Sequence, residues 1–253
     1  DSESGSLTVE APANFQVSNL TPASVTVTEG ATVNVSLDVT NVGDQQGTQT
    51  IVATLGGTTL GSKSVTLNAG ESTTLTPLLD TSQLTPGSYT YEIASANDSV
   101  SGSLTVEAPA NFEVSNLTPA TQTVTNGTAI DVAADIENTG DQQGTQTVTL
   151  SVGGLTRTQS QTLAAGASTT VTFSVDTGLL GPGSYTRAIA TANDSATGSL
   201  TVQAPVNFTV TNLAPASATV TNGTTVDITA DITNTGDVQS TQTVTLSAGG
   251  VTQ

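Results

Sequence analysis

Cysteine, methionine, tryptophan and histidine are all absent from this chain of 253 residues. Without cysteine no disulfide can stabilise the fold, and the redox compartment cannot be read from the sequence. Without histidine or cysteine the common pairs of a nucleophile and a general base cannot be assembled. The sequence therefore predicts a protein that is not an enzyme and that needs no cofactor.

Positive charge is nearly absent as well, because three Lys and Arg residues stand against 21 Asp and Glu, giving a net charge of −18. Such a chain repels the phosphates of nucleic acids and anionic lipid headgroups, so neither is an expected partner. The acid excess with a single lysine favours a halophilic origin. Concentrated salt screens the repulsion between the acids, since the Debye length falls to about 3 Å at 1 M.

Long hydrophobic runs are also missing. No stretch of about 18 apolar residues occurs, so we expect no direct membrane insertion in this segment. No signal-peptide pattern is found either. Residue 1 is expected to follow a cleavage or to open a window on a longer chain.

What the sequence does contain is an internal repeat. The pentapeptide GSLTV occurs at residues 5–9, 102–106 and 198–202, with offsets of 97 and 96 residues. That period is too long for a solenoid unit and matches the commonest size of an independent domain. We predict four segments: residues 1–10 as the last strand of a preceding repeat, 11–107 and 108–203 as complete repeats, and 204–253 as the N-terminal part of a further repeat.

Each repeat is organised around an Asn-x-Gly-Asp turn between two runs of alternating apolar and polar residues. The turn lies at residues 41–44, 138–141 and 234–237. A turn signal between two alternating runs predicts a strand, a tight turn and a second strand.

The middle repeat shows period-2 alternation throughout, with a turn every 8–12 residues and no helical period. This pattern predicts an all-β fold of tandem seven-stranded immunoglobulin-like sandwiches. The strands are expected at 111–117 with a short extension at 121–125, and at 129–137, 145–152, 155–163 and 167–176. The sequence GPGSY at 181–185 is expected to start the sixth strand, and GSLTVQ at 198–203 to form the seventh. The side chains expected to face the core are those of Ile130, Val132, Ala134, Ile136, Val148, Leu150, Val152, Val171, Phe173 and Val175.

A few residues are assigned structural rather than binding roles. Tyr89 and Tyr185 follow Pro-Gly-Ser, where such a sandwich places its tyrosine corner. The core anchors are expected to be Phe15, Phe112 and Phe208. Pro77 takes the place of Phe173 in the first repeat, and proline belongs on an edge strand or at a bulge, so a local irregularity is predicted there.

The junctions between repeats are short. They read VEAPANF at 106–112 and VQAPVNF at 202–208, with no Gly/Ser spacer. A short linker that contains proline is semi-rigid, so we expect the repeats to be arranged as a semi-rigid rod.

Together, the turn at 138–140, the sequence Leu-Ala-Ala-Gly at 163–166 and the Pro-Gly-x-Tyr corner resemble the cell-adhesion-related domain CARDB. Those domains are immunoglobulin-like modules, often in tandem, in large bacterial and archaeal surface proteins. Each repeat resembles the family nearly end to end, although it ends in GSLTV instead of the acidic-Asn-Asn ending common there. With the acid excess, the chain is similar to haloarchaeal surface proteins. The resemblance implies an extracellular or cell-surface structural or adhesive role.

Acidic residues are the remaining candidates for catalytic or metal-binding groups. Asp131 and Asp135 could form an acid pair, but they are expected on a solvated strand face. Their counterparts are Asp227 and Asp231 in the third segment, and Asn34 and Asp38 in the first repeat. The turn aspartates lack the clustered oxygens that calcium requires, so a calcium site is not favoured; they are expected to bond nearby backbone. These aspartates are Asp44, Asp141 and Asp237.

Asn-x-Ser/Thr sequons are the modification motif in the chain. Thr and Ser are so common that several sequons would arise by chance, but four lie in predicted turns, where a glycan could be attached in an exported protein. The possible N-glycosylation sites are Asn19, Asn34, Asn97, Asn116, Asn126, Asn193, Asn207 and Asn222.

The main hypothesis is a non-catalytic structural repeat protein of an extracellular filament, surface layer or cell-surface stalk in a halophilic archaeon. Its expected partners are further copies of the same repeat, with glycans as an additional possibility. The alternative is an adhesin-type module that recognises polysaccharide or another cell surface. A third class is the non-catalytic stalk of a larger enzyme.

Two explanations fit the partial repeats at the ends of the chain. The strand at residues 1–10 could complete the C-terminal segment of another copy by strand addition. Alternatively, the chain is a window on a longer array. Residues 1–10 can supply only one of the three strands that 204–253 needs, so the window is favoured.

Overall fold

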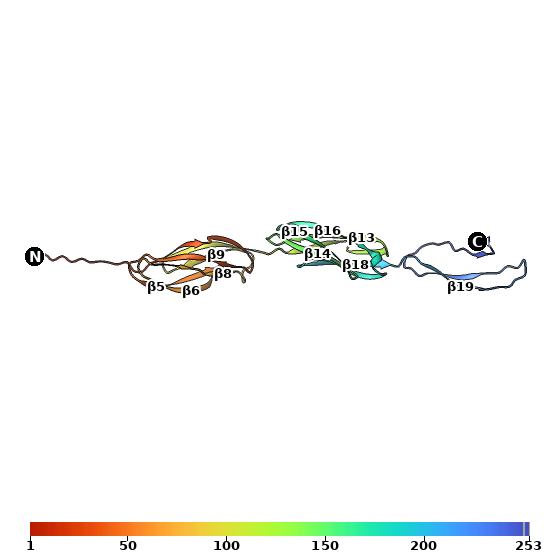
Figure 1. The fold of residues 1–253 in the computed structure, drawn as a ribbon, viewed down its shortest axis with the longest axis horizontal. Helices are drawn as coiled ribbons and strands as arrows, with labels where there is room; N and C mark the ends of the chain where they lie inside the picture. Colours follow the sequence, from red (N-terminus) through yellow and green to blue (C-terminus); the bar gives the residue numbers. More distant parts are fainter. Residues whose placement is uncertain (250, 253) are drawn as a thin grey trace. The chain divides into compact units, whose positions relative to one another are not determined.

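The computed structural model describes residues 1–249 and 251–252, and the regular secondary structure of these residues is almost entirely β-strand (Figure 1). The one helix within this described part is a single 3-10 turn, η1 (Thr177–Leu179). The chain divides into two compact units, residues 1–111 with 140–144 and residues 112–139 with 145–253. The predicted all-β class of immunoglobulin-like sandwiches is confirmed.

The second repeat forms two sheets. One has the order β11-β13-β16 and the other β12-β18-β17-β14-β15. The chain crosses between them at the cis bond from Thr118 to Pro119, so the predicted first strand and its extension belong to opposite sheets. The strands are β11 (Phe112–Thr118), β12 (Thr121–Thr125), β13 (Ala129–Asn138), β14 (Gly144–Val152), β15 (Leu155–Leu163), β16 (Ser168–Asp176), β17 (Gly183–Ala190) and β18 (Ser195–Gln203).

The core lies between these sheets and follows the predicted alternation. In β13, Ile130, Val132 and Ile136 are buried, while Asp131 and Glu137 on the opposite face are exposed. Successive side chains of a strand point to opposite faces, so a period-2 sequence buries one face alone. The predicted core is confirmed, since these residues are buried too: Ala134, Val148, Leu150, Val152, Val171, Phe173 and Val175.

The first repeat has the same plan, but one sheet is interrupted. Its sheets are β1-β4-β7, β3-β8 and β2-β10-β9-β5-β6. The strands are β1 (Phe15–Thr21), β2 (Ser24–Thr28), β3 (Thr32–Asn34), β4 (Ser36–Asn41), β5 (Gly47–Leu55), β6 (Thr58–Leu67), β7 (Ser72–Leu75), β8 (Leu78–Asp80), β9 (Gly87–Ala94) and β10 (Ser99–Glu107).

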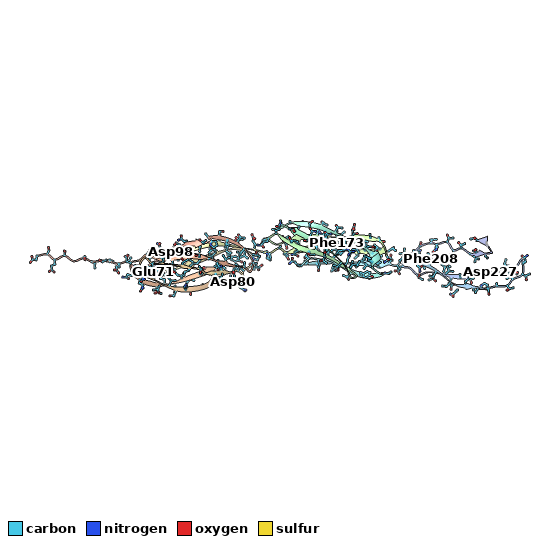
Figure 2. The ribbon with its side chains drawn as sticks, in the orientation of Figure 1. Glu71, Asp80, Asp98, Phe173, Phe208 and Asp227 are labelled. Atoms are coloured by element: carbon cyan, nitrogen blue, oxygen red, sulfur yellow. The ribbon has the colours of Figure 1, made fainter. Side chains whose placement is uncertain are left out.

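The interruption lies at Pro77, between β7 and β8, as predicted. Val35 still donates to the carbonyl of Pro77 (3.1 Å), but proline has no N–H to give in return. In the second repeat the equivalent pair, Val132 and Phe173, lies within an unbroken ladder between β13 and β16. Figure 2 labels Phe173 in that continuous strand.

Both complete repeats contain the predicted tyrosine corner. The Tyr89 hydroxyl donates to the carbonyl of Thr85 (2.8 Å), and the Tyr185 hydroxyl donates to the carbonyl of Gly181 (2.7 Å). Each bond joins the start of a strand, β9 or β17, to the loop four residues upstream. The hydroxyls are therefore occupied by the fold.

One core position holds different residues in the two repeats. Tyr91 donates to the carbonyl of Pro22, and Arg187 donates to the carbonyl of Pro119 and to Gln122 Oε1 (3.3 Å). Arg187 is fully buried, and burial lowers the pKa of its guanidinium because desolvation disfavours the charged form. Arginine thus replaces tyrosine as the donor that holds the chain after the cis proline.

Residues 204–252 contain fewer paired strands: β19 (Phe208–Ala214) with β20 (Thr229–Asn234), and β21 (Ser247–Ala248) with β22 (Val251–Thr252). Phe15 and Phe112 are buried as predicted, but Phe208 is only half-buried. The expectation that Phe208 is a core anchor is therefore wrong in this structure. Among the described residues no second sheet packs over the β19–β20 pair.

Residues 1–14 form no strand, and Leu7 and Val9 are 89% and 84% exposed. The assignment of residues 1–10 to the last strand of a preceding repeat stays a prediction. Within the part of the chain that the structure describes, no helix is long and apolar enough to cross a membrane.

Candidate functional site

The Asn-x-Gly-Asp turn grips the chain that leads into its own repeat. In the first repeat the Asp44 carboxylate accepts a hydrogen bond from the N–H of Ala11 (2.9 Å). The N–H of Asp44 in turn donates to the carbonyl of Ala11 (3.1 Å). One residue therefore binds both polar groups of the alanine, and we call this pair of bonds the aspartate clamp.

The clamp occurs three times with the same geometry. Ala108 donates to the Asp141 carboxylate at 2.9 Å, and Ala204 donates to the Asp237 carboxylate at 2.7 Å. The return bonds from Asp141 and Asp237 to the alanine carbonyls are both 3.1 Å. The expectation that these aspartates bond nearby backbone is wrong, because each partner lies 33 residues upstream.

The glycine of the turn is required by close approach of the leading chain. A Cβ at Gly43 would lie 2.1 Å from the carbonyl oxygen of Pro12, and one at Gly140 would lie 2.0 Å from that of Pro109. At Gly236 the corresponding distance to the Pro205 oxygen is 1.9 Å. No larger residue fits while the Ala-Pro segment stays in place.

The buried asparagine of the turn hydrogen-bonds the backbone around the clamp. Asn41 is fully buried; its Oδ1 accepts from the N–H groups of Asn14 (3.0 Å) and Gly43 (3.1 Å). Its Nδ2 donates to the carbonyls of Gln45 (2.8 Å) and Leu67 (3.2 Å). Its Nδ2 also lies 3.2 Å from the carbonyl of Asn68, and a buried amide that bonds five backbone groups gives the turn one defined conformation.

A second network holds the first strand of each complete repeat. In the second repeat the N–H of Phe112 donates to Asn193 Oδ1 (3.0 Å), and the N–H of Val114 donates to the Asp194 carboxylate (2.9 Å). The Thr191 hydroxyl donates to the carbonyl of Phe112 (2.7 Å). Side chains of one turn thus pair with backbone that a neighbouring strand would otherwise occupy.

The first repeat builds the same network with Asn97, Asp98 and Ser95 (Figure 2 labels Asp98). The sequence identifies Asn97 and Asn193 as sequons in predicted turns, but their bonds to the first strand were not predicted. The signal was present, because both repeats keep a hydroxyl residue two positions before Asn-Asp.

The sequon asparagines differ in accessibility. Asn126 is half-buried, and its Nδ2 donates to the carbonyls of Thr177 (3.0 Å) and Leu180, so its amide nitrogen is already used. The amide nitrogens of Asn19 and Asn116 donate to Asp38 and Asp135, both at 2.9 Å. Apart from Asn126, all the sequon asparagines are exposed, and among them Asn207 donates its amide nitrogen to the Thr235 hydroxyl (2.8 Å).

Asp131 and Asp135 do not form an acid pair with a shared environment. Asp131 is exposed, whereas Asp135 accepts from the Thr170 hydroxyl (2.6 Å) and from Asn116. These two bonds, the first from Thr170, lower the pKa of Asp135 because they stabilise its charged form. Asn116 has a positive φ of 52°, so Asp135 also holds a residue in the left-handed region.

Metal ligands do not gather in the described residues, since no group of three or more acidic side chains there could hold an ion. The turn aspartates Asp44, Asp141 and Asp237 are exposed and bonded to backbone. Their carboxylate oxygens accept hydrogen bonds from backbone N–H groups in this fold.

Comparison with known proteins supports the resemblance drawn from the sequence. The CARDB family model matches residues 109–198, which confirms the CARDB-like assignment of the second repeat. The CARDB domain is a non-enzymatic immunoglobulin-like domain, related to cell adhesion and often found on surface proteins. No curated protein sequence matches this chain.

Similar solved structures include the CARDB domain of a Pyrococcus furiosus protein, described as a complex with di-metal ions. It is 14% identical, the match covers 40% of this chain and 97% of that one, and the TM-score is 0.33. A β-glucosidase from Erythrobacter marinus (16% identity, 37% and 15% coverage, TM-score 0.33) and one from Listeria innocua (21%, 39% and 16%, 0.32) also match. This chain thus spans a small part of those enzymes, and at such TM-scores none of these likenesses carries a functional argument.

The close approach at the clamp generates a prediction about Gly43→Ala. The added methyl group would collide with the Pro12 carbonyl, so the clamp must open and the free energy of unfolding should fall by about 1–3 kcal/mol. Urea titration checks the stability, and amide exchange at Ala11 should become faster. Gly61→Ala is the matched control, because a Cβ there meets nothing within 4 Å. Equal stability of both variants would contradict the requirement for glycine.

The lowered pKa of Asp135 predicts a pH-dependent effect of Asp135→Asn. A carboxylate with a depressed folded-state pKa stabilises the fold above its unfolded pKa of about 3.9, and this contribution is lost as pH falls through the folded value. The variant should therefore be less stable than the parent at pH 7 and equally stable near pH 2. Asp131→Asn removes the same charge without these bonds and serves as the control; a similar loss in both variants would rule out the hydrogen bonds as the cause.

Proposed function

We propose that this chain is a non-catalytic structural repeat protein of an extracellular filament, surface layer or cell-surface stalk in a halophilic archaeon. The single observation that carries the proposal is the aspartate clamp, which recurs in all three segments. A binding protein needs an exposed site, whereas a spacer needs defined junctions between its modules. The CARDB match adds the association with surface proteins.

The clamp supports the proposed semi-rigid rod. The Ala-Pro segment before each repeat has its alanine N–H and carbonyl bonded to the following turn, so the backbone there is not free to swivel. The proline that follows has a fixed φ. A linker with bonded backbone and no Gly/Ser spacer favours stiffness over flexibility. Further copies of the repeat would then extend the rod.

The placement of charge supports the halophilic origin. None of the 21 acidic side chains is buried, whereas Arg187, one of three basic residues, is fully buried. Exposed cations are therefore reduced to Lys63 and Arg157. The surface carries dense negative charge with little internal compensation, and dissolved salt must screen it.

The adhesin alternative is less well supported. Recognition of polysaccharide usually relies on exposed aromatic rings, but Phe15, Phe112 and Tyr91 are buried here. Tyr89 and Tyr185 use their hydroxyls in the tyrosine corners. The aromatic residues of the complete repeats thus serve the fold.

Location is the property that tests the proposed function. Immunoelectron microscopy of the source cells with an antibody against residues 1–253 should place the protein outside the cell. Mass mapping of the native protein should find glycan on the exposed Asn97 or Asn193 before the half-buried Asn126, whose amide nitrogen is already hydrogen-bonded. Cytoplasmic labelling, with an unmodified chain, would overturn the proposal.

Salt dependence is the second expectation. Because the surface acids repel one another, the melting temperature should rise steadily from dilute buffer to molar NaCl. Thermal unfolding followed by circular dichroism measures this. A variant with four exposed glutamates replaced by glutamine, for example Glu3, Glu71, Glu92 and Glu137, should show a weaker dependence. A melting temperature that does not change with salt would contradict a halophilic origin.

A further inference from the structure

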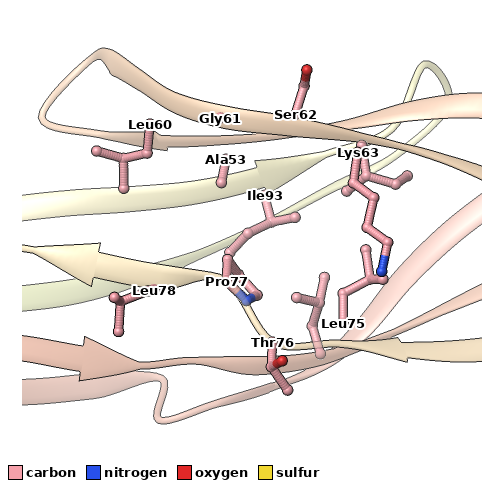
Figure 3. A pocket seen from close by; sticks show the side chains of 12 residues that line it. Ala53, Leu60, Gly61, Ser62, Lys63, Leu75, Thr76, Pro77, Leu78 and Ile93 are labelled. Carbon is pink, nitrogen blue, oxygen red and sulfur yellow. The ribbon is translucent and has the colours of Figure 1, made fainter.

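The first repeat contains a cavity that the second repeat lacks. It has a volume of about 290 Å³ and lies between β5 and β6 on one side and the interrupted strand β7–β8 on the other (Figure 3). Its floor is formed by the buried residues Leu37, Ile51, Leu75 and Ile93. The corresponding region of the second repeat, around Leu150, holds about 10 Å³.

Two large side chains of the second repeat are replaced by small ones around this cavity. Ala53 stands where the second repeat has Leu150, and Pro77 stands where it has Phe173. Both Leu150 and Phe173 are buried and fill the space between the sheets. The first repeat therefore lacks a leucine side chain on one wall and a phenyl ring on the other, and a larger Leu37 in place of Ala134 does not fill the gap.

The edge of the sandwich is also opened at this point. In the second repeat Gln159 donates to the carbonyl of Thr172 (2.7 Å), which ties β15 to β16. The equivalent residue in the first repeat is Lys63. Near it, a register shift between β5 and β6 pairs Ala53 with Gly61 and Thr54 with Thr59, which leaves Leu60 as an extra residue of β6. No hydrogen bond from Lys63 closes this edge in the described structure. Leu60 and Leu78 at the rim are 41% and 52% exposed, so the cavity is open to solvent.

The charge at the opening is unusual for this chain. Lys63 is the single basic residue among residues 1–156, and its side chain lines the cavity. Figure 3 shows it running from β6 toward the level of Leu75. On a protein with a net charge of −18, small anions are repelled from most of the surface. At this opening, however, an anion would find a cation beside an apolar cavity.

We propose that this cavity is a binding site for a small aromatic carboxylate. The ring would occupy the space that Phe173 fills in the second repeat, and the carboxylate would pair with the Lys63 ammonium at the opening. Burial of the ring supplies the attraction and the ion pair selects the anion. The proposal is independent of the structural role above, because a rod module can bind a small molecule without being an adhesin.

Binding can be tested on the full chain with 3-phenylpropionate as the probe. Titration followed by calorimetry or by amide chemical shifts, in the lowest salt concentration at which circular dichroism shows the chain to be folded, should show one saturable site in the first repeat. Two related molecules separate the contributions. The amide 3-phenylpropanamide keeps the ring but lacks the charge, and propionate keeps the charge but lacks the ring; both should bind more weakly.

Three variants restore the residues of the second repeat. Ala53→Leu and Pro77→Phe should each raise the Kd by at least about tenfold, because they fill the space for the ring. Ala53→Leu keeps the test valid if Pro77→Phe fails to fold.

Lys63→Gln should raise the Kd about three- to tenfold for the carboxylate and leave that of the amide unchanged. Arg157→Gln, which removes an exposed cation of the second repeat, is the control and should have no effect.

Several results would overturn the site. Absence of saturable binding at tens of millimolar probe would do so, as would binding that survives in both Ala53→Leu and Pro77→Phe. Equal affinity for 3-phenylpropionate and its amide, with no effect of Lys63→Gln, would show that Lys63 selects nothing. Shifts confined to residues outside the cavity would also contradict it.

Discussion

The pair of hydrogen bonds between a turn aspartate and an alanine 33 residues earlier is the constraint on which each repeat depends. It ties the entry of the chain to the hairpin at the centre of the repeat. The buried asparagine and the glycine of the turn allow the leading Ala-Pro segment to lie close against the turn. Because both backbone polar groups of the leading alanine are bonded to the turn aspartate, these hydrogen bonds fix where each repeat begins.

Around this constraint the two complete repeats vary their cores in different ways. Tyr91 and Arg187 occupy equivalent positions, and each donates a hydrogen bond to the carbonyl of the cis proline in its own repeat. Pro77 and Phe173 are equivalent in sequence but differ in packing: the Phe173 ring fills the space between the sheets, whereas Pro77 leaves a cavity there. The fold thus tolerates a divided sheet when the hydrogen bonds of the turn and of the first strand remain in place.

Much of the fold was predictable from the sequence because sandwich cores follow a period-2 pattern. The buried face of β13, the tyrosine corners and the irregularity at Pro77 follow from local rules of strand and turn chemistry. The partners of Asp44 and Asn97 could not be found that way, because they lie 33 and 82 residues away and depend on which strands become neighbours. Phe208 shows the same limit, since burial needs an opposing sheet and not merely an aromatic residue at the right register.

The clamp also bears on how such a chain can change in length. Each repeat holds its own leading segment with its own turn, so the bonds that define a boundary are contained in the copy that follows it. Duplication of one 96- or 97-residue period therefore adds a module together with the connection that joins it to the one before. A gene built in this way can grow or shrink by whole repeats while every junction keeps the same chemistry.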